Sequence, residues 1–359
     1  RQRQMCIRDS SDVLASSLAM QIRYTEAAVV GRRSITFWRC EAPARGADLV
    51  RHREVQRELV AAAARAGERA RRRPLLCEFY WGTGMGRELV CQLVEEGADV
   101  AMCDVSDDNM QETKALAQAK GEGRVLSFVC DVSDESAVQD FQRHVAKEFD
   151  TDHINILFNN AGIAGGGAFV NMVRTEWDRC FDVCFYGVFY GCNAFMPMLL
   201  ASDEGYIVNT SSVNGFWASV GPDVSHTAYS AAKFAVKGFT EEIITDLRLN
   251  APHVKCSVVM PGHIGTSIAL NTSQVHGKGG AMDMSSEEVA FMRSRYSEAG
   301  LPVDNLPDDD IRKMVLQVQE DFRDKAPTSA SQAAKIILDG VREERWRILV
   351  GDDAYVLDE

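Results

Sequence analysis

The chain has 359 residues, 46% of them hydrophobic, and a formal net charge of −13. This length allows one large or two ordinary domains, and the hydrophobic fraction is that of a globular protein with a core. The negative charge argues against nucleic acid as the main partner. No apolar run reaches the roughly 18 residues that cross a bilayer, so we expect no membrane span.

Residues 1–73 differ in composition from the rest of the chain. They hold 16 Arg, 8 acidic residues and no Lys, a net charge of +8 against about −21 for the remainder. An organelle presequence is Arg-rich but poor in acidic residues, so it fits only in part. We interpret 1–73 as an atypical Arg-rich extension, poorly ordered or non-native apart from a candidate helix at 50–70, and 74–359 as the folded domain.

The cysteines and histidines do not form a metal motif. Ten cysteines and seven histidines are scattered along the chain, without a Cys-x-x-Cys pair or a cluster with zinc spacing. We therefore expect no metal. We interpret the cysteines as small buried residues of a protein in a reducing compartment, and expect a cytoplasmic location.

Short apolar segments alternate with amphipathic ones from residue 75 onward. Apolar segments without polar alternation are typical of strands buried on both faces. They occur at residues 75–81, 98–103, 125–130, 154–158, 206–209, 254–259 and 347–350. Helical periodicity predicts helices at residues 87–96, 109–120, 135–149, 177–198, 229–249 and, after a cap at Thr328 or Ser329, up to 339.

This alternation predicts a doubly wound α/β fold, in which about seven parallel strands are covered by helices on both faces. Ligands of such folds bind beyond the carboxyl ends of the strands. Residues 265–327 are the least regular part, with one helix expected to open at 285–287 and an acidic run at 308–310. We interpret 265–327 as an insertion that covers the substrate.

Glycine and acidic residues stand at the ends of the predicted strands. A glycine turn, with Gly82, Gly84 and Gly86, follows the first strand, where it would let the backbone approach a pyrophosphate. Asp104 ends the second strand, where a carboxylate binds ribose hydroxyls and repels a 2′-phosphate, which favours NAD over NADP. Asp131, after the third strand, would contact adenine or cap the next helix.

Tyr229 and Lys233 are four residues apart, on one face of a predicted helix. A free phenol has a pKa of about 10, and a neighbouring ammonium lowers that pKa towards the working range of an acid or base. Ser212, on a turn after a strand, is placed to hold a substrate oxygen. Such a Tyr/Lys pair also occurs by chance in many helices, so it gains weight only from the motifs around it.

These motifs follow one another in the order Gly84-Met85-Gly86, Asp104, Asp131-Val132, Asn159-Asn160-Ala161-Gly162, Ser212, Tyr229 with Lys233, and Pro261-Gly262. In this order the chain resembles the short-chain dehydrogenase/reductase family, closely over residues 75–265 and loosely at 347–349. The resemblance implies that Tyr229 exchanges the hydroxyl proton of the substrate. It implies that Lys233 lowers the pKa of that tyrosine and binds the nicotinamide ribose, and that Ser212, rather than Ser211, holds the substrate oxygen.

The resemblance also implies a nicotinamide cofactor. Asn159 would support the central strands, Gly162 would let the backbone pass the adenosine ribose, and Thr266 would line the carboxamide. The implied cofactor-binding residues are Gly82, Gly84, Met85, Gly86, Asp104, Asp131, Val132, Asn159, Asn160, Ala161, Gly162, Tyr229, Lys233, Pro261, Gly262 and Thr266.

Two positions depart from the family pattern. Tyr80 stands where the first glycine of the turn is usual, and its ring would crowd a pyrophosphate unless Gly82 substitutes. Cys184 stands where the family often has an asparagine whose backbone carbonyl holds a water that links the lysine to solvent. A backbone carbonyl survives this exchange, whereas the helix distortion and the side-chain support depend on the new residue.

We therefore predict an NAD-preferring oxidoreductase acting on a secondary alcohol or ketone. Five apolar residues suggest an apolar substrate, namely Phe216, Trp217, Met282, Met284 and Phe291. The resemblance implies a homodimer or homotetramer built on the helices at 177–198 and 229–249. One alternative is a catalytically impaired dinucleotide-binding scaffold, supported by Tyr80 and Cys184. Another is a methyltransferase, which leaves the Tyr229/Lys233 pair without a role.

Overall fold

The computed structural model describes residues 73–79, 83–165, 169–219, 225–275, 277 and 279–358, and two short strands before them. Contacts divide the chain into two units, 1–72 and 73–359. In the first unit, β1 (Ala27–Val30) pairs antiparallel with β2 (Arg33–Thr36). The expected poor order of this segment and its candidate helix at 50–70 fall outside the described residues.

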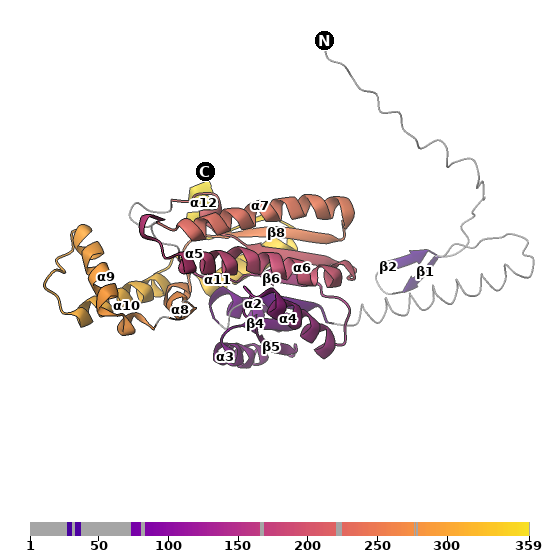
Figure 1. Ribbon diagram of the computed structural model, residues 1–359. Coiled ribbons are helices and arrows are strands. Elements are labelled where there is room, and N and C mark those ends of the chain that lie inside the picture. The colour runs from indigo at the N-terminus through magenta and orange to yellow at the C-terminus, as the bar shows by residue number, and fades with distance from the viewer. Residues whose placement is uncertain are drawn as a thin grey trace, which may run out of the picture. The chain divides into compact units, whose positions relative to one another are not determined.

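A seven-stranded parallel sheet forms the centre of the second unit (Figure 1). Its spatial order is β11-β8-β7-β6-β3-β4-β5. The strands are β3 (Leu75–Phe79), β4 (Asp99–Asp104), β5 (Val125–Val129), β6 (Ile156–Asn159), β7 (Gly205–Thr210), β8 (Val254–Pro261) and β11 (Arg347–Val350). The predicted doubly wound α/β fold is confirmed. The chain runs from β3 to one edge and returns through β6 on the other side of β3, so the order reverses between these two strands, where ligands of such sheets bind.

Neighbouring residues of one strand face opposite layers of the fold. Leu76 packs in one core with the helices α2 (Gly84–Glu95), α3 (Asp107–Gln118) and α11 (Ala330–Arg342). Cys77 packs in the other core with α4 (Glu135–Glu148) and α7 (Thr227–Asn250). Both residues are almost fully buried. The sheet is therefore covered on both faces, which explains the continuous apolar strands in the sequence.

The long apolar helix predicted at 177–198 is interrupted. It consists of α5 (Arg174–Phe181), a π-helical turn (Asp182–Tyr186) and α6 (Gly187–Leu200). The run from Arg174 to Leu200 is long and apolar enough to cross a membrane, because its most apolar 18-residue window has a mean hydropathy of 1.5, but half of that window is buried inside the fold. Phe195 and Leu199 pack in the core with α4 and α7, as in a core helix of a globular protein.

The insertion is helical. It contains α8 (Ile268–Val275), a short 3₁₀ turn (Ala281–Asp283), α9 (Ser286–Glu298) and α10 (Asp308–Asp324). Two short parallel strands, β9 (Ile264–Gly265) and β10 (Thr328–Ser329), join its two ends. A small separate core of Val289, Val303 and Ile311 holds α9 and α10 together beyond the end of the sheet (Figure 1).

Two details of the helices differ from expectation. The acidic run at 308–310, which we did not predict to be helical, forms the first turn of α10. Carboxylates stabilise a helix there because they lie at the positive end of its dipole. The sequence favours Ser133 as the cap of the helix predicted at 135–149, but Asp134 caps α4, because its carboxylate accepts the amides of Ser136 and Ala137. A final helix, α12 (Asp352–Asp358), follows β11.

Removing residues 1–72 should leave the second unit folded, because contacts divide the chain at this point and both layers of the core lie after it. We expect the melting temperature of the truncated chain to stay within about 3 °C of the full chain, the effect of less than about 1 kcal/mol in a domain of this size. Thermal unfolding followed by circular dichroism measures this. A truncated chain without a cooperative transition would show that the segment belongs to the domain.

Candidate active site

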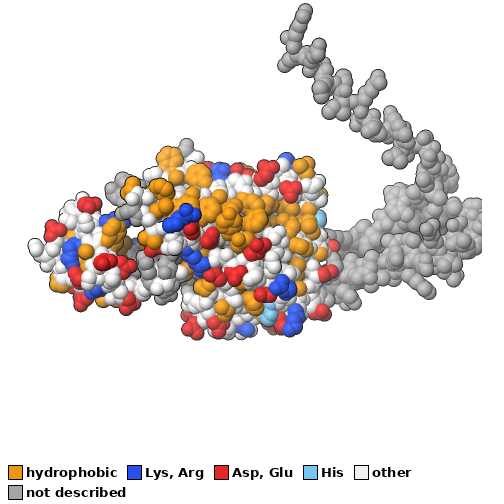
Figure 2. Space-filling model, viewed as in Figure 1, with side chains coloured by type: hydrophobic (Ala, Val, Ile, Leu, Met, Phe, Trp, Pro, Cys, Tyr) orange, Lys and Arg blue, Asp and Glu red, His pale blue; other side chains and the backbone are white. Residues whose placement is uncertain are grey.

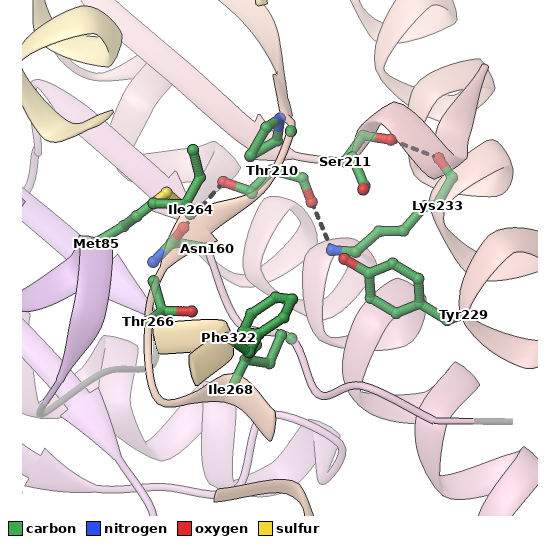
Figure 3. A pocket seen from close by; sticks show the side chains of 14 residues that line it. Met85, Asn160, Thr210, Ser211, Tyr229, Lys233, Ile264, Thr266, Ile268 and Phe322 are labelled. Atoms are coloured by element: carbon green, nitrogen blue, oxygen red, sulfur yellow. Dashed lines mark hydrogen bonds between the residues drawn. The ribbon is translucent and has the colours of Figure 1, made fainter. Parts of the chain in front are cut away.

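A cavity lies beyond the carboxyl ends of β6, β7 and β8 (Figure 3). Its polar lining consists of Asn160, Thr210, Ser211, Ser212, Tyr229, Lys233 and Thr266. Its remaining lining consists of Met85, Gly162, Pro261, Gly262, Ile264, Ile268 and Phe322. The cavity thus gathers residues from several strand ends and helix starts that are far apart in sequence, at the edge where the fold predicts a ligand.

Lys233 is buried beneath this cavity, with 2% of its surface exposed. Its ammonium donates a hydrogen bond to the carbonyl of Thr210 at 2.9 Å, and Nζ lies 5.5 Å from the ring centroid of Tyr229. Burial lowers the pKa of Lys233 from its usual value, since a charged group loses hydration there, while the thiols of Cys184 and Cys180 act in the opposite sense. The lysine therefore lies directly beside the predicted catalytic tyrosine.

Burial dominates the titration of Tyr229. It raises the pKa of the phenol above its usual value, and a hydrogen bond with Ser212 only partly offsets this effect. The depression by Lys233 that the resemblance implies is therefore not the net result in the protein alone. A protonated phenol is the state that can donate a proton to a carbonyl oxygen.

The two adjacent serines are used differently. The Ser211 hydroxyl donates to the carbonyl of Lys233 at 2.7 Å, and this bond ties the end of β7 to α7. A Cβ on Gly215 would lie 2.3 Å from the Ser211 oxygen, so the approach of this turn to α7 requires glycine. Ser212 accepts the amide of Asn214 at 3.2 Å and lines the same cavity as Tyr229. The structure therefore places Ser212, the serine chosen from the sequence, in one cavity with the phenol.

The glycine turn is described from residue 83 onward. Gly84 begins α2 with φ of 62°, a left-handed conformation that favours glycine, and Gly86 is buried. No side chain caps this helix, and its first turn carries no acidic residue. The positive end of α2 can therefore receive a phosphate group. Gly82 and Tyr80 lie outside the described residues, so the predicted crowding at Tyr80 stays a prediction.

Asp104 and Asp131 lie outside the lining of the cavity. Asp104 is buried at the end of β4 and accepts the amide of Ser106 at 2.8 Å. Asp131 forms an ion pair with Arg179 of α5 at 2.8 Å and accepts the Ser133 hydroxyl at 2.7 Å. Partial burial opposes its ionisation, but these bonds outweigh burial and lower the pKa of Asp131.

These contacts give Asp131 a role in the fold. Its ion pair braces the turn before α4 against α5, and its neighbour Val132 is fully buried against Gly187 of α6. The adenine contact expected of Asp131 and Val132 stays a prediction. Sequence spacing did not reveal the ion pair, because its partner Arg179 lies 48 residues away.

The Asn-Asn-Ala-Gly segment after β6 ties the central strands together. The Asn159 amide donates to the Asn209 side chain on β7 at 2.8 Å. Asn160 accepts the hydroxyl of Thr210 at 3.2 Å, and Ala161 is buried. A Cβ on Gly162 would lie 3.4 Å from the Lys233 ammonium. This segment therefore sets the position of both the β7 carbonyl and the lysine that it binds.

Cys184 lies at the centre of the π-helical turn and is fully buried. Its thiol donates to the carbonyl of Ile163 at 3.4 Å and accepts the amide of the same residue at 3.5 Å. A hydrogen bond from Cys180, together with the charge of Lys233, lowers the pKa of Cys184 against the effect of burial. The helix distortion and a side-chain support for the neighbouring loop are therefore both present with cysteine at this position.

The apolar residues that suggested the substrate do not line the cavity. Phe291, Met282 and Trp217 are about half exposed, Met284 packs against the core of α9 and α10, and Phe216 packs with Val213. The apolar lining comes instead from Met85, Ile264, Ile268 and Phe322. Ile264 and Ile268 were not predicted from the sequence, although their place shortly after Pro261-Gly262 was a signal that could have found them. Phe322 lies on α10, whose amphipathic pattern was its only signal.

No metal site accompanies these residues. In the part of the chain that the structure describes, no group of three or more His, Cys, Asp or Glu side chains is placed to hold a metal ion. The eight cysteines of this part are all buried. Their burial fits a packing role.

Comparisons with known proteins agree with this geometry. A model of the family described as short chain dehydrogenase matches residues 81–276. The SadH protein of Mycobacterium tuberculosis, named as an oxidoreductase, is 34% identical over 280 residues, which cover 77% of this chain and 86% of SadH. Human epidermal retinol dehydrogenase 2 is 31% identical over 188 residues, which cover 52% of this chain and 59% of that protein.

A solved short-chain dehydrogenase/reductase from Burkholderia phymatum, in complex with NAD, superposes with a TM-score of 0.61 at 26% identity. The match covers 77% of this chain and 89% of that structure. The parallel sheet, the Tyr229/Lys233 pair at its carboxyl edge and the family match over 81–276 lead to one conclusion. The chain is an oxidoreductase of the short-chain dehydrogenase family.

Proposed function

We propose that the protein is an NAD-preferring dehydrogenase or reductase that interconverts a secondary alcohol and a ketone. The observation that carries this proposal is the position of Tyr229 beside the buried ammonium of Lys233, in the cavity that Ser212 also lines. A methyltransferase would have no use for this arrangement. A scaffold without turnover would not need this arrangement. Tyr80 and Cys184 were the two reasons to consider a scaffold, and the π-helical turn at Cys184 argues against the second.

The three residues divide the proton chemistry between them. Ser212 holds the substrate oxygen against the Tyr229 hydroxyl, which gives its proton to that oxygen in reduction and takes a proton from it in oxidation. Lys233 places a positive charge beside the phenol, where it stabilises the phenolate left after donation. Because burial favours the protonated phenol, the phenolate depends on this charge.

The residues present fit a nicotinamide cofactor, which would supply the hydride acceptor or donor when bound. Gly84, with its left-handed backbone, and the uncapped start of α2 would hold the pyrophosphate. Pro261, Gly262 and Thr266, which line the cavity, would contact the nicotinamide, and Gly162 would let the backbone pass the adenosine ribose. Asp104 would bind the adenosine ribose. The NAD in the related Burkholderia structure supports this choice.

The substrate would be small and partly apolar, because Met85, Ile264, Ile268 and Phe322 face the same cavity as the tyrosine. Relatives include a retinol dehydrogenase and a levodione reductase, which share the class of reaction. The buried thiols fit a reducing compartment, and we propose a cytoplasmic location on that ground.

We propose a homodimer or homotetramer built on an aromatic face of Tyr186, Phe189, Tyr190 and Phe234. These side chains lie on the π-helical turn, α6 and α7, and Tyr186, Phe189 and Phe234 are each about 40% exposed. Figure 2 shows hydrophobic side chains gathered over this part of the molecule. Contiguous exposed aromatic residues are typical of protein interfaces.

Light scattering should therefore give at least twice the mass of one chain for the parent protein. Phe234→Glu places a charge in the aromatic face and should lower the mass to that of a monomer. Leu116→Glu, on α3 and 44% exposed, is the matched control and should leave the mass unchanged. A monomeric parent would contradict the proposed assembly.

Tyr229→Phe removes only the hydroxyl that we assign to proton transfer. Turnover of a panel of secondary alcohols with NAD should fall by about 100- to 10,000-fold, the usual contribution of general acid–base catalysis. NADH affinity, measured by fluorescence titration, should remain unchanged. Tyr355→Phe, on the exposed face of α12, is the control and should keep full activity. Unchanged turnover in Tyr229→Phe would refute the mechanism.

Asp104→Ser tests the cofactor preference. The parent should bind NADH more tightly than NADPH, because a carboxylate repels a 2′-phosphate. Removing the charge should raise the affinity for NADPH relative to NADH by at least about tenfold, because the repulsion between unit charges about 4 Å apart lies between about 1 kcal/mol in water and about 4 kcal/mol near a protein surface. Serine can retain the turn with Ser106. Asp246→Ser, exposed on α7, is the control, and a parent that prefers NADPH would contradict the role of Asp104.

A further inference from the structure

The two ends of the insertion lie next to Pro261-Gly262, which we propose to contact the nicotinamide. β9 follows Pro261-Gly262 directly, and it pairs with β10 where the chain returns from α10. A Cβ on Gly265 would lie 2.6 Å from the carbonyl oxygen of Arg323, so the last turn of α10 rests directly on β9. The position of α10 over the cavity is therefore fixed from its C-terminal end.

His263 connects this turn to the rest of the fold. Its backbone amide donates to the carboxylate of Asp353 on α12 at 2.6 Å. Its Nε2 lies 2.8 Å from the carbonyl oxygen of Phe322, and the two rings are 4.2 Å apart between centroids. Because a carbonyl can only accept a hydrogen bond, Nε2 carries the proton. One side chain thus holds Phe322 by a hydrogen bond and by ring contact.

Phe322 faces the cavity, although it lies on the insertion. Its ring is drawn beside Ile268 in the close view of the cavity, which Tyr229 and Thr266 also line (Figure 3). The ring is not part of the small core that joins α9 and α10, which is built on Val289, Val303 and Ile311. The insertion therefore does not need this aromatic side chain for its own packing, whereas the cavity gains an apolar wall from it.

We infer that Phe322 is the specificity-determining wall of the substrate cavity and that His263 is the positioning residue that fixes it. The inference rests on the proposed function. Phe322 limits the length of the apolar group on the alcohol carbon. His263 keeps the ring at that limit by bonding the backbone of α10, and Asp353 keeps His263 in place from the opposite side.

Steady-state kinetics with NAD and a series of 2-alkanols, from 2-butanol to 2-decanol, tests the wall. Phe322→Ala should raise the ratio of kcat/KM for the longest alcohols to that for 2-butanol by at least about tenfold, in the range that hydrophobic pockets discriminate. Val318→Ala, one turn earlier on α10 and 58% exposed, is the matched control and should leave the ratio unchanged. An unchanged ratio in Phe322→Ala would overturn the assignment.

His263 is tested by the same ratio and by hydrogen–deuterium exchange of the full chain. His263→Ala should raise the ratio in the same direction and speed exchange at residues 316–326, while NADH affinity stays unchanged. His263→Phe keeps an aromatic ring but removes the hydrogen-bond donor. If this variant restores only part of the parent's alcohol ratio and exchange rate, the part that is not restored is the contribution of the hydrogen bond. Unchanged exchange and unchanged ratio would overturn the positioning role.

Failure of the proposed function can be distinguished from failure of the substrate wall alone. A parent chain that oxidises none of the alcohols contradicts the proposed function, and with it the substrate wall. The exchange experiment then still decides whether His263 holds α10, because it needs no turnover.

Discussion

A buried ammonium ion is the constraint on which the site depends. Lys233 is 2% exposed, and burying a charge is unfavourable unless hydrogen bonds replace its hydration. The carbonyl of Thr210 provides one such bond, at the end of β7. This carbonyl can point at the lysine only if β7 ends there and α7 starts beside it, so the position of the charge is set by the meeting of two elements.

Several neighbouring residues hold the end of β7 against the start of α7. Ser211 bonds the backbone of Lys233, Gly215 allows the close approach, and Asn160 accepts from Thr210. On the other side, Gly162 leaves room for the ammonium, and Cys184 bonds both backbone groups of Ile163. The π-helical turn at Cys184 places the thiol there. These residues are separate motifs in the sequence, but in the structure they pack together around the ammonium of Lys233.

The sequence predicted the parts of this unit that depend on local pattern. Apolar segments located every strand of the large sheet, and the limits predicted for β11 agree with the structure. The sequence also gave the tyrosine and lysine on one helix face. It could not separate a packing role from a cofactor role at Asp131, because Arg179 reaches that carboxylate only through the tertiary fold. For the same reason Phe322 was missed, since its place in the cavity depends on where α10 returns to β10.

The insertion shows why the substrate side is the hardest part to predict. The catalytic residues lie on β7 and α7, whose geometry is set by the sheet, so spacing along the chain identifies them. The substrate wall comes from a helix with its own small core, and its position over the cavity rests on His263 and Gly265. Methionines and aromatics of the insertion that suggested an apolar pocket pack within the insertion or face outward instead. In this fold the chemistry can be inferred from the sequence, whereas the specificity follows from how the insertion is anchored.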